Sequence, residues 1–245
     1  MRPFYQTEWL DIAFSSFAEM SFSSLPGTLF YGSFYQKFFE RYDQMEELKP
    51  SWLESKNNVA DFIKARFSAS TRILSVGCGL GIIEKRLLGH FRQIEVTEIS
   101  ATPLRWIAPL LPPQNVHVGF FPDCIPPERD YDLILLSAID YSFGTPEWIA
   151  FLKSLKTRLV KGGQCLIVSA SFDPQGNRLG RFLKELIKGV VYGTRTALKI
   201  PPKKQFWGYL RTQKDYYSSL QVAGYVATEE GFTSDGLYWI KGQNA

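Results

Sequence analysis

Histidine and cysteine are scarce in this chain of 245 residues. It has two histidines, His90 and His117, and three cysteines without Cys-x-x-Cys spacing. Scattered cysteines in odd number argue against a disulfide framework and against a zinc site, so we expect a cytoplasmic protein without a bound metal. We expect both histidines to be structural or exposed. An obvious histidine base for proton transfer is therefore missing.

Long apolar runs are also absent. No stretch approaches the roughly 20 residues that a membrane-spanning helix needs. The first residues, MRPFYQTEWLDIAF, are interrupted by Glu8 and Asp11, which is unlike a signal peptide. Hydrophobic residues make up 45% and charged residues 21%, an ordinary globular balance, and the length suits one α/β domain with a small appendage. Nothing in the sequence specifies an oligomeric state.

Positive charge is concentrated in one segment. Between Phe172 and Asp215 there are ten basic and three acidic residues, a net charge of +7, although the whole chain carries only +4. Within this segment, KKQFWGYLRT mixes basic and aromatic side chains. Such a segment favours an anionic partner.

The hydrophobic pattern changes near residue 69. Before it, we expect an aromatic-rich helical cap over 1–68, with helices around 9–20, 32–45 and 59–67. After it, strands are expected at 73–76, 94–97, 116–119, 131–137, 165–169, 225–228 and 237–241. Helices are expected at 82–91, 103–111, 145–159 (N-cap Thr145, ended by Gly162 and Gly163), 181–191, and from the Thr212–Asp215 capping box to Gly224. The alternation predicts a mostly parallel α/β sheet with helices on both faces, closed by an antiparallel hairpin.

A glycine loop follows the first of these strands. Gly77, Gly79 and Gly81 have GxGxG spacing, and Ile82 stands where the dinucleotide pattern GxGxxG would have its third glycine. No Gly-Lys-Ser/Thr follows, which excludes a phosphate P-loop. Glu98 ends the next strand, where a carboxylate can accept hydrogen bonds from both ribose hydroxyls. The pattern predicts an adenosine cofactor without a pyrophosphate.

The sequence resembles a known family over residues 72–242. VGCGLG with Glu98, the LILLS strand, LVKGG and the closing hairpin are similar to class I S-adenosylmethionine-dependent methyltransferases of the small-molecule type. The resemblance implies a Rossmann-like seven-stranded sheet with an antiparallel last strand, S-adenosylmethionine as cofactor and no metal. Ser75 is a departure, because the family usually has an acidic residue there. The cofactor contacts expected are Gly77, Cys78, Gly79, Gly81, Glu98, Ile99, Asp123 and Ser137, with Phe120 or Phe121 as alternatives to Asp123 beside the adenine.

The acceptor side is expected after the strand 131–137, in SAIDYSF. We expect Asp140 or Tyr141 to orient or deprotonate the acceptor; the alternative is that Asp140 caps a turn and Tyr141 packs. Two segments would cover the acceptor, the cap over 1–68 and a basic lid insertion, 172–212, within the methyltransferase domain, 69–245. Their expected substrate-binding residues are Tyr31, Tyr35, Trp207, Tyr209 and Arg211.

The function predicted is methyl transfer to an oxygen or nitrogen of a small acceptor that is anionic or resembles a sugar or natural product. An RNA methyltransferase is an alternative, because basic and aromatic side chains can contact phosphates and stack on bases. The chain lacks an NPPY or DPPY motif after 131–137 and an appended RNA-binding domain, so nucleic acid is not the expected partner. A further alternative is an inactive methyltransferase-like partner subunit, suggested by Ser75.

Overall fold

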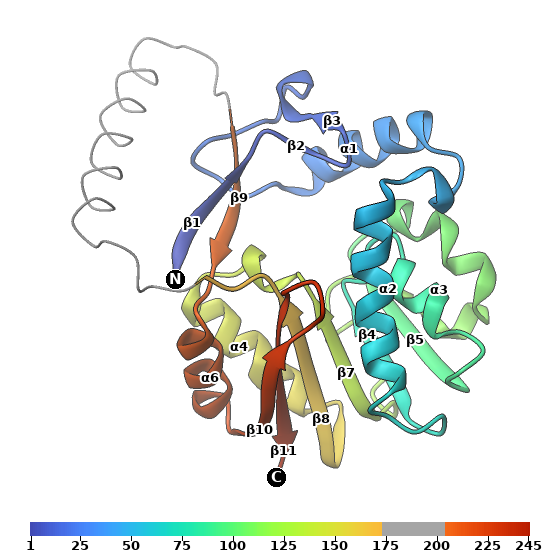
Figure 1. Ribbon diagram of the computed structural model, residues 1–245, viewed down its shortest axis with the longest axis vertical. Helices are drawn as coiled ribbons and strands as arrows, with labels where there is room; N and C mark the ends of the chain where they lie inside the picture. Colours follow the sequence, from blue (N-terminus) through green and yellow to red (C-terminus); the bar gives the residue numbers. More distant parts are fainter. Residues whose placement is uncertain (173–203) are drawn as a thin grey trace.

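A computed structural model describes residues 1–172 and 204–245 and is built around a seven-stranded sheet (Figure 1). The strand order is β10-β11-β8-β7-β4-β5-β6. β11 is antiparallel to both of its neighbours, and the other adjacent pairs are parallel. The predicted Rossmann-like sheet is confirmed. Its strands are β4 (Arg72–Val76), β5 (Gln93–Glu98), β6 (Val116–Val118), β7 (Tyr131–Ser137), β8 (Leu159–Ser169), β10 (Tyr225–Phe232) and β11 (Tyr238–Asn244).

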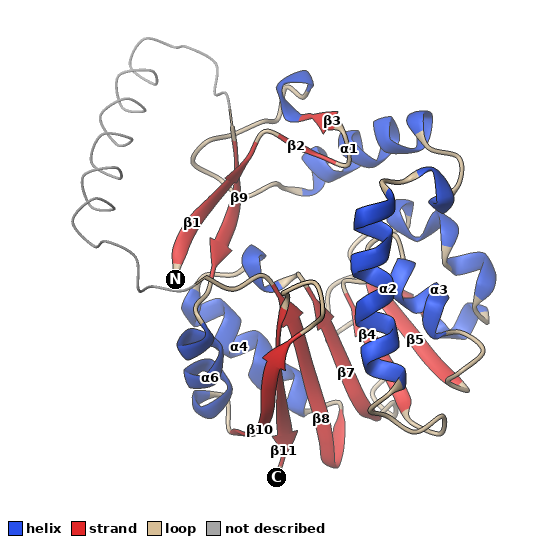
Figure 2. Ribbon diagram, in the orientation of Figure 1, coloured by secondary structure: helices blue, strands red, loops and turns tan. Residues whose placement is uncertain are grey.

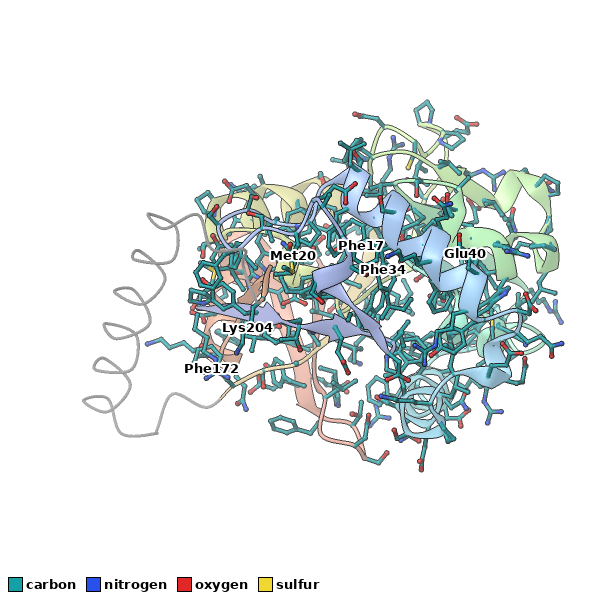
Figure 3. All side chains as sticks on the ribbon, turned by 90° about the horizontal axis from the view of Figure 1, so that it is seen from above. Phe17, Met20, Phe34, Glu40, Phe172 and Lys204 are labelled. Carbon is teal, nitrogen blue, oxygen red and sulfur yellow. The ribbon has the colours of Figure 1, made fainter. Side chains whose placement is uncertain are left out.

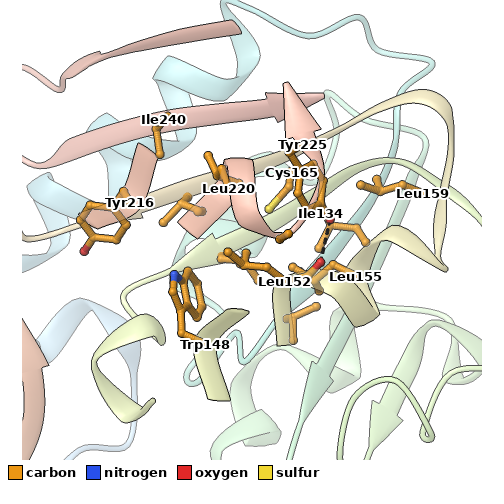
Figure 4. Close-up of a cluster of buried hydrophobic side chains, with 14 of the residues drawn as sticks. Ile134, Trp148, Leu152, Leu155, Leu159, Cys165, Tyr216, Leu220, Tyr225 and Ile240 are labelled. Atoms are coloured by element: carbon orange, nitrogen blue, oxygen red, sulfur yellow. Dashed lines mark hydrogen bonds between the residues drawn. The ribbon is translucent and has the colours of Figure 1, made fainter. Parts of the chain in front are cut away.

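Helices cover both faces of this sheet, as predicted (Figures 1 and 2). α2 (Pro50–Lys64) and α3 (Ile82–Leu87) bury apolar side chains against one face. α4 (Thr145–Lys156) and α6 (Gln213–Val222) cover the other. Figure 4 shows Trp148 and Leu152 of α4 in one cluster with Tyr216 and Leu220 of α6. The Tyr225 hydroxyl donates to the main-chain oxygen of Leu152 over 3.0 Å, which fixes β10 to α4.

The helix ends follow local chemistry. α6 begins with the predicted capping box, in which Thr212 accepts from the Asp215 N–H and Asp215 accepts from the Thr212 N–H. For α4, the N-cap is Gly144 and not the expected Thr145. The glycine pair expected to end α4 lies inside β8, where Gly162 has a φ of 77°.

The helix expected over 103–111 is wrong. The segment forms two short 3-10 helices, η3 (Thr102–Trp106) and η4 (Ala108–Leu110). Pro109 has no N–H and its ring clashes with the preceding turn, so a continuous α-helix cannot pass through it. A third 3-10 turn, η5 (Pro113–Asn115), leads into β6.

The N-terminal segment mixes strands and helices. β2 (Glu8–Trp9) and β3 (Ile12–Ala13) form a tight hairpin followed by η1 (Phe14–Ser16), so the helix expected over 9–20 is wrong. Leu10 and Asp11 make the turn with positive φ values of 49° and 60°. The other expected helices appear as α1 (Thr28–Arg41) and α2, with η2 (Met45–Glu47) between them. The helix expected over 181–191 lies outside the described residues.

A two-stranded ribbon joins the chain start to the end of the expected lid insertion. β1 (Arg2–Gln6) pairs antiparallel with β9 (Gln205–Leu210), and we call this pair the β1–β9 ribbon. The ribbon, β2, β3 and α1 lie beyond the carboxyl ends of β7 and β8 (Figure 1). Figure 3, seen from above, labels Phe17 and Phe34 among the side chains of this N-terminal part. They share a core with Trp207 of β9 and with Leu80 and Ile82 beside the glycine loop.

Candidate active site

The glycine loop connects β4 to α3 at the carboxyl edge of the sheet. All three predicted glycines adopt left-handed backbone conformations, with φ values of 66° for Gly77, 58° for Gly79 and 71° for Gly81. A Cβ on Gly77 would lie 2.7 Å from Ile139, and one on Gly81 would lie 2.3 Å from Ile107. These two glycines are needed for packing.

Gly79 differs from its two neighbours in the loop. A Cβ placed on it would meet only the Tyr35 hydroxyl, at 3.9 Å. Its N–H donates to Glu98 Oε2 over 3.0 Å. Gly79 therefore presents open backbone next to the carboxylate of Glu98 and the phenol of Tyr35.

Glu98 ends β5 and is tied to the loop. Besides the bond from Gly79, its Oε1 accepts the N–H of Ile99 over 2.9 Å. Burial raises the pKa of Glu98, and the two N–H donors act in the opposite direction. The carboxylate is thus held in one orientation beside the glycine loop, as ribose recognition needs.

Exposed apolar side chains flank Glu98. Glu98 pairs with Val118 across β5 and β6, so the residues after both strands lie at one edge. There Ile99 is 40% exposed and Phe120 is 68% exposed, surfaces that a flat base can cover. Asp123 lies farther along an exposed turn, in which the Cys124 N–H donates to Phe120 over 3.0 Å. Phe120 and Asp123 are thus both exposed on the segment that follows β6.

Four aromatic side chains that the sequence analysis placed on the acceptor side contact one another next to the glycine loop. Trp207 of β9 stacks on Tyr141 with ring centroids 6.1 Å apart and meets Tyr31 edge-on at 6.0 Å. Tyr31 in turn lies 6.3 Å from Tyr35 on α1. Burial is the main cause that raises the pKa of Tyr35, and the charge of Glu98 raises it further. Burial also raises the pKa of Tyr141 to about 12.

Asp140 and Arg211 meet each other instead of facing the aromatic group. Asp140, in η6 (Asp140–Ser142), is 2% exposed and accepts hydrogen bonds from Ser169 (2.5 Å) and Tyr216 (2.7 Å). Arg211 is 1% exposed; its Nη1 lies 3.5 Å from Asp140 Oδ2 and donates to the Asp140 main-chain oxygen. The arrangement favours a structural role for both residues.

The other predicted site residues are half-buried on β9, at the end of β7 and in the glycine loop. Tyr209 is half-buried on β9 and meets Phe206 edge-on at 5.3 Å. Ser137 is half-buried at the end of β7, where it pairs with Val168. Cys78 is half-buried in the loop, and burial raises the pKa of its thiol. Both of its loop neighbours, Gly77 and Gly79, are cofactor candidates too.

One acidic residue next to the loop was missed by sequence reasoning. Glu84, on α3, is 1% exposed and accepts a hydrogen bond from Ser75 over 2.5 Å. The signal was present, because a residue three positions after Gly81 falls in the first turn of the helix that the loop begins. No local sequence pattern pairs Glu84 with Ser75, because the two residues lie on different elements, α3 and β4.

Two classes of feature are not found in the part of the chain that is described. Within residues 1–172 and 204–245, no group of histidine, cysteine and acidic side chains could hold a metal ion. In the same ranges, none of the helices combines the length and apolar character needed to cross a membrane.

Comparison with known proteins identifies a family. A family profile described as a methyltransferase domain matches residues 36–222, and a sequence comparison with curated proteins finds no match. Among solved structures, magnesium protoporphyrin IX methyltransferase (ChlM) from Synechocystis PCC 6803, with bound SAH, is similar. It has a TM-score of 0.59 and 14% identity, over 88% of this chain and 95% of that one.

Two longer proteins share the fold. The pyocyanin biosynthetic protein PhzM has a TM-score of 0.58 and 15% identity, over 79% of this chain. Human N-acetylserotonin methyltransferase, in complex with SAM, has a TM-score of 0.55 and 17% identity, over 77% of this chain. This chain spans only 56% of the length of PhzM and 52% of the human enzyme.

Proposed function

Because the chain belongs to the methyltransferase domain family and has the class I fold, we propose that it transfers a methyl group from S-adenosylmethionine to an oxygen or nitrogen of a small acceptor. One arrangement carries this proposal. The Glu98 carboxylate accepts the N–H of Gly79 at the carboxyl edge, and a Cβ on Gly79 would lie 3.9 Å from the hydroxyl of Tyr35, which packs in one aromatic group with Tyr31, Trp207 and Tyr141.

Different residues of the chain would bind the different parts of the cofactor. Gly77, Gly79 and Gly81 would lie along the methionine part of the cofactor, Glu98 would accept hydrogen bonds from the ribose, and Ile99 and Phe120 would enclose the adenine. When bound, the cofactor supplies an electrophilic methyl group. The protein's contribution is then alignment of the acceptor and exclusion of water by the aromatic group.

Proton removal points to the kind of acceptor. His117 is buried against Glu95 at 2.7 Å, and His90 is exposed after α3, so neither histidine belongs to the site. Asp140 is enclosed by Arg211, Ser169 and Tyr216. Burial raises the pKa of Tyr141 to about 12, so its hydroxyl stays protonated at neutral pH and can orient an acceptor but not deprotonate it.

Because none of these described residues can act as a base, we infer an acceptor atom that needs none, such as the ionised oxygen of a carboxylate or an acidic phenol, or the nitrogen of a neutral amine. An ionised oxygen agrees with the anionic acceptor expected from the basic segment. The names of the structural neighbours, which include methyltransferases of magnesium protoporphyrin IX and N-acetylserotonin, support a small acceptor over RNA.

The first test is calorimetric titration of the whole chain with S-adenosylmethionine and with S-adenosylhomocysteine. We expect micromolar binding that falls at least tenfold in Glu98→Ala, because the ribose loses its acceptor. The matched control is Glu128→Ala, an exposed carboxylate just before the amino end of β7, which should bind like the wild type. Absence of binding by the folded wild type would refute the proposal and favour the inactive partner subunit.

The acceptor class is tested separately. Transfer of a labelled methyl group is measured with panels of carboxylic acids, phenols graded by pKa, anionic sugars, amines and RNA. We expect rates that follow the ionised fraction of the acceptor as pH changes. Transfer to RNA alone would contradict a small acceptor while leaving the cofactor site intact, and transfer to neutral amines alone would identify nitrogen as the acceptor atom.

A further inference from the structure

Trp207 occupies a β-bulge in the β1–β9 ribbon. The register moves from the pair Phe4–Gly208 directly to the pair Tyr5–Phe206. Trp207 is therefore an extra residue, which no residue of β1 opposes within these two described strands. Gly208 follows it with a φ of 135°, in the region of positive φ that favours glycine. A bulge of this kind bends a strand locally and turns a side chain in a new direction.

The bulge packs Trp207 against two other rings. Its ring stacks on Phe14 with centroids 4.9 Å apart and an interplanar angle of 8°, and on Tyr141 at 6.1 Å and 27°. Trp207 is only 3% exposed. It therefore presents almost no surface to an acceptor, and any effect that it has on methyl transfer must pass through its neighbours.

Gly208 brings the main chain of β9 against the main chain of Tyr141. A Cβ on Gly208 would lie 2.8 Å from the carbonyl carbon of Tyr141 and closer still to its oxygen. Because these are main-chain atoms, no side-chain rotation could make room for the Cβ. The bulge thus supports Tyr141 twice, with the ring of Trp207 against its ring and the backbone of Gly208 against its carbonyl group.

Tyr141 connects the bulge to the glycine loop. Two residues before it, Ile139 packs against the loop, where a Cβ on Gly77 would lie 2.7 Å from the Ile139 side chain. Ala138, between this contact and β7, adopts a φ of 56°, which is uncommon for a residue with a side chain. Burial raises the pKa of Tyr141, and a hydrogen bond from Tyr31 opposes this increase. The position of Tyr141 is therefore set by the loop on one side and by β9 on the other.

We propose that the bulge of β9 is a positioning device for methyl transfer, in which Trp207 and Gly208 hold Tyr141 so that its hydroxyl orients the acceptor. The inference rests on the proposed function. It makes Trp207 and Gly208 positioning residues that act through Tyr141 and do not contact the acceptor. Loss of the bulge should misalign the acceptor but leave cofactor binding intact, because the glycine loop and Glu98 belong to other elements.

The first experiment follows Tyr141 without needing an acceptor. The whole chain is labelled with 3-fluorotyrosine, and the fluorine resonance of Tyr141 is assigned by its loss in Tyr141→Phe. We expect Gly208→Ala to shift or broaden this resonance, while affinity for S-adenosylhomocysteine stays within about twofold of wild type. The control is Gly89→Ala, which adds a methyl group at another positive φ, 82°, with nothing within 4 Å, and should change neither.

The second experiment measures transfer of a labelled methyl group to the acceptor that the wild type uses best. We expect Gly208→Ala to lower kcat about 10- to 100-fold, as misplacement of an orienting group can. Trp207→Phe keeps a ring against Tyr141 and should lose less than Trp207→Leu, which provides a reading if Gly208→Ala folds poorly. In a Tyr141→Phe background, Gly208→Ala should cost little more, because the hydroxyl that it positions is already absent.

Four results would overturn this role of the bulge. Wild-type transfer by Gly208→Ala, an unchanged fluorine resonance of Tyr141, or full additivity in the Tyr141→Phe background would each show that the bulge does not act through Tyr141. Equal weakening of transfer and of S-adenosylhomocysteine binding would show a structural role alone. If the folded wild type binds no S-adenosylhomocysteine, the proposed function fails instead, and the fluorine resonance still shows whether β9 positions Tyr141.

Discussion

Arg211 lies across Asp140 and fixes β9 to the carboxyl end of β7. Its Nη1 lies 3.5 Å from Asp140 Oδ2, and its Nη2 donates to the main-chain oxygen of Phe143 over 2.7 Å. The guanidinium also lies 5.1 Å from the centre of the Trp148 ring. Two residues expected to contact the substrate instead hold the segment that carries Trp207.

Removing this guanidinium should destabilise the protein strongly. Arg211→Ala leaves the Asp140 carboxylate buried without its cation, and we expect a loss of about 3–5 kcal/mol in the free energy of unfolding. The control is Arg72→Ala, whose pair with Asp132 is 41% and 37% exposed and should contribute under about 1 kcal/mol. Urea denaturation measures both, and equal losses would contradict a structural role for Arg211.

Gly81 should tolerate alanine much less than Gly89 does. Both have positive φ, 71° and 82°, but a Cβ on Gly81 would lie 2.3 Å from Ile107, whereas one on Gly89 meets nothing within 4 Å. We expect about 1–2 kcal/mol for the backbone strain in Gly89→Ala. Gly81→Ala should cost clearly more or prevent folding. Similar denaturation midpoints for the two variants would show that the contact with Ile107 relaxes easily.

Gly79→Ala should separate binding from stability. The new Cβ has room, since the Tyr35 hydroxyl is 3.9 Å away, so we expect only the strain of about 1–2 kcal/mol. The methyl group would, however, stand where the cofactor approaches the backbone. We expect affinity for S-adenosylhomocysteine to fall at least tenfold by calorimetry, while Gly89→Ala keeps wild-type affinity. Retained affinity in Gly79→Ala would place the ligand elsewhere on the loop.

The Glu95 cluster should make stability depend on pH. Burial raises the pKa of Glu95, but hydrogen bonds from His117 (2.7 Å) and Tyr131 (2.9 Å) and the charge of Arg129 outweigh it, and the net pKa lies below the usual 4.5. A lowered pKa gives stability that is fully present above 4.5 and is lost as pH falls through the lower folded value.

We therefore expect the free energy of unfolding of the wild type to fall below about pH 4.5, more steeply than that of Glu95→Gln, which cannot ionise. Glu128→Gln, at an exposed position, is the control and should keep the wild-type slope. Urea denaturation between pH 3 and 7 measures all three. Parallel curves for the wild type and Glu95→Gln would exclude Glu95 as the source of the slope.

Local sequence signals predicted the sheet and the juxtaposition of the glycine loop with Glu98. The run from Tyr131 to Ser137 predicted β7 with its observed bounds, and Gly77, Gly79 and Glu98 lie together as expected. These features depend on short apolar runs, glycine spacing and strand ends, all of which are local. The two residues at the turn after β2, Leu10 and Asp11, carry no such signal, so the left-handed turn was taken for helix.

The acceptor side depends on contacts that no local pattern encodes. Asp140 and Arg211 are 71 positions apart. From the sequence alone, the carboxylate of Asp140 suits catalysis and the guanidinium of Arg211 suits substrate binding, as well as each suits a structural ion pair. Only the fold shows that each is the other's partner. Likewise, Glu84 looked like an ordinary residue of a helix until α3 placed it against Ser75.

The β1–β9 ribbon has a consequence for how the site is assembled. Arg2 pairs with Leu210, so this two-stranded sheet joins nearly opposite ends of the chain, and closing so long a loop is slow and entropically costly. The glycine loop and Glu98 come together from neighbouring strands, β4 and β5, which are separated by few residues and lie in the first half of the chain. A chain still being synthesised can therefore bring the glycine loop and Glu98 together well before β9, which carries Trp207, exists. Pairing of β1 with β9 must therefore wait until most of the chain has been made.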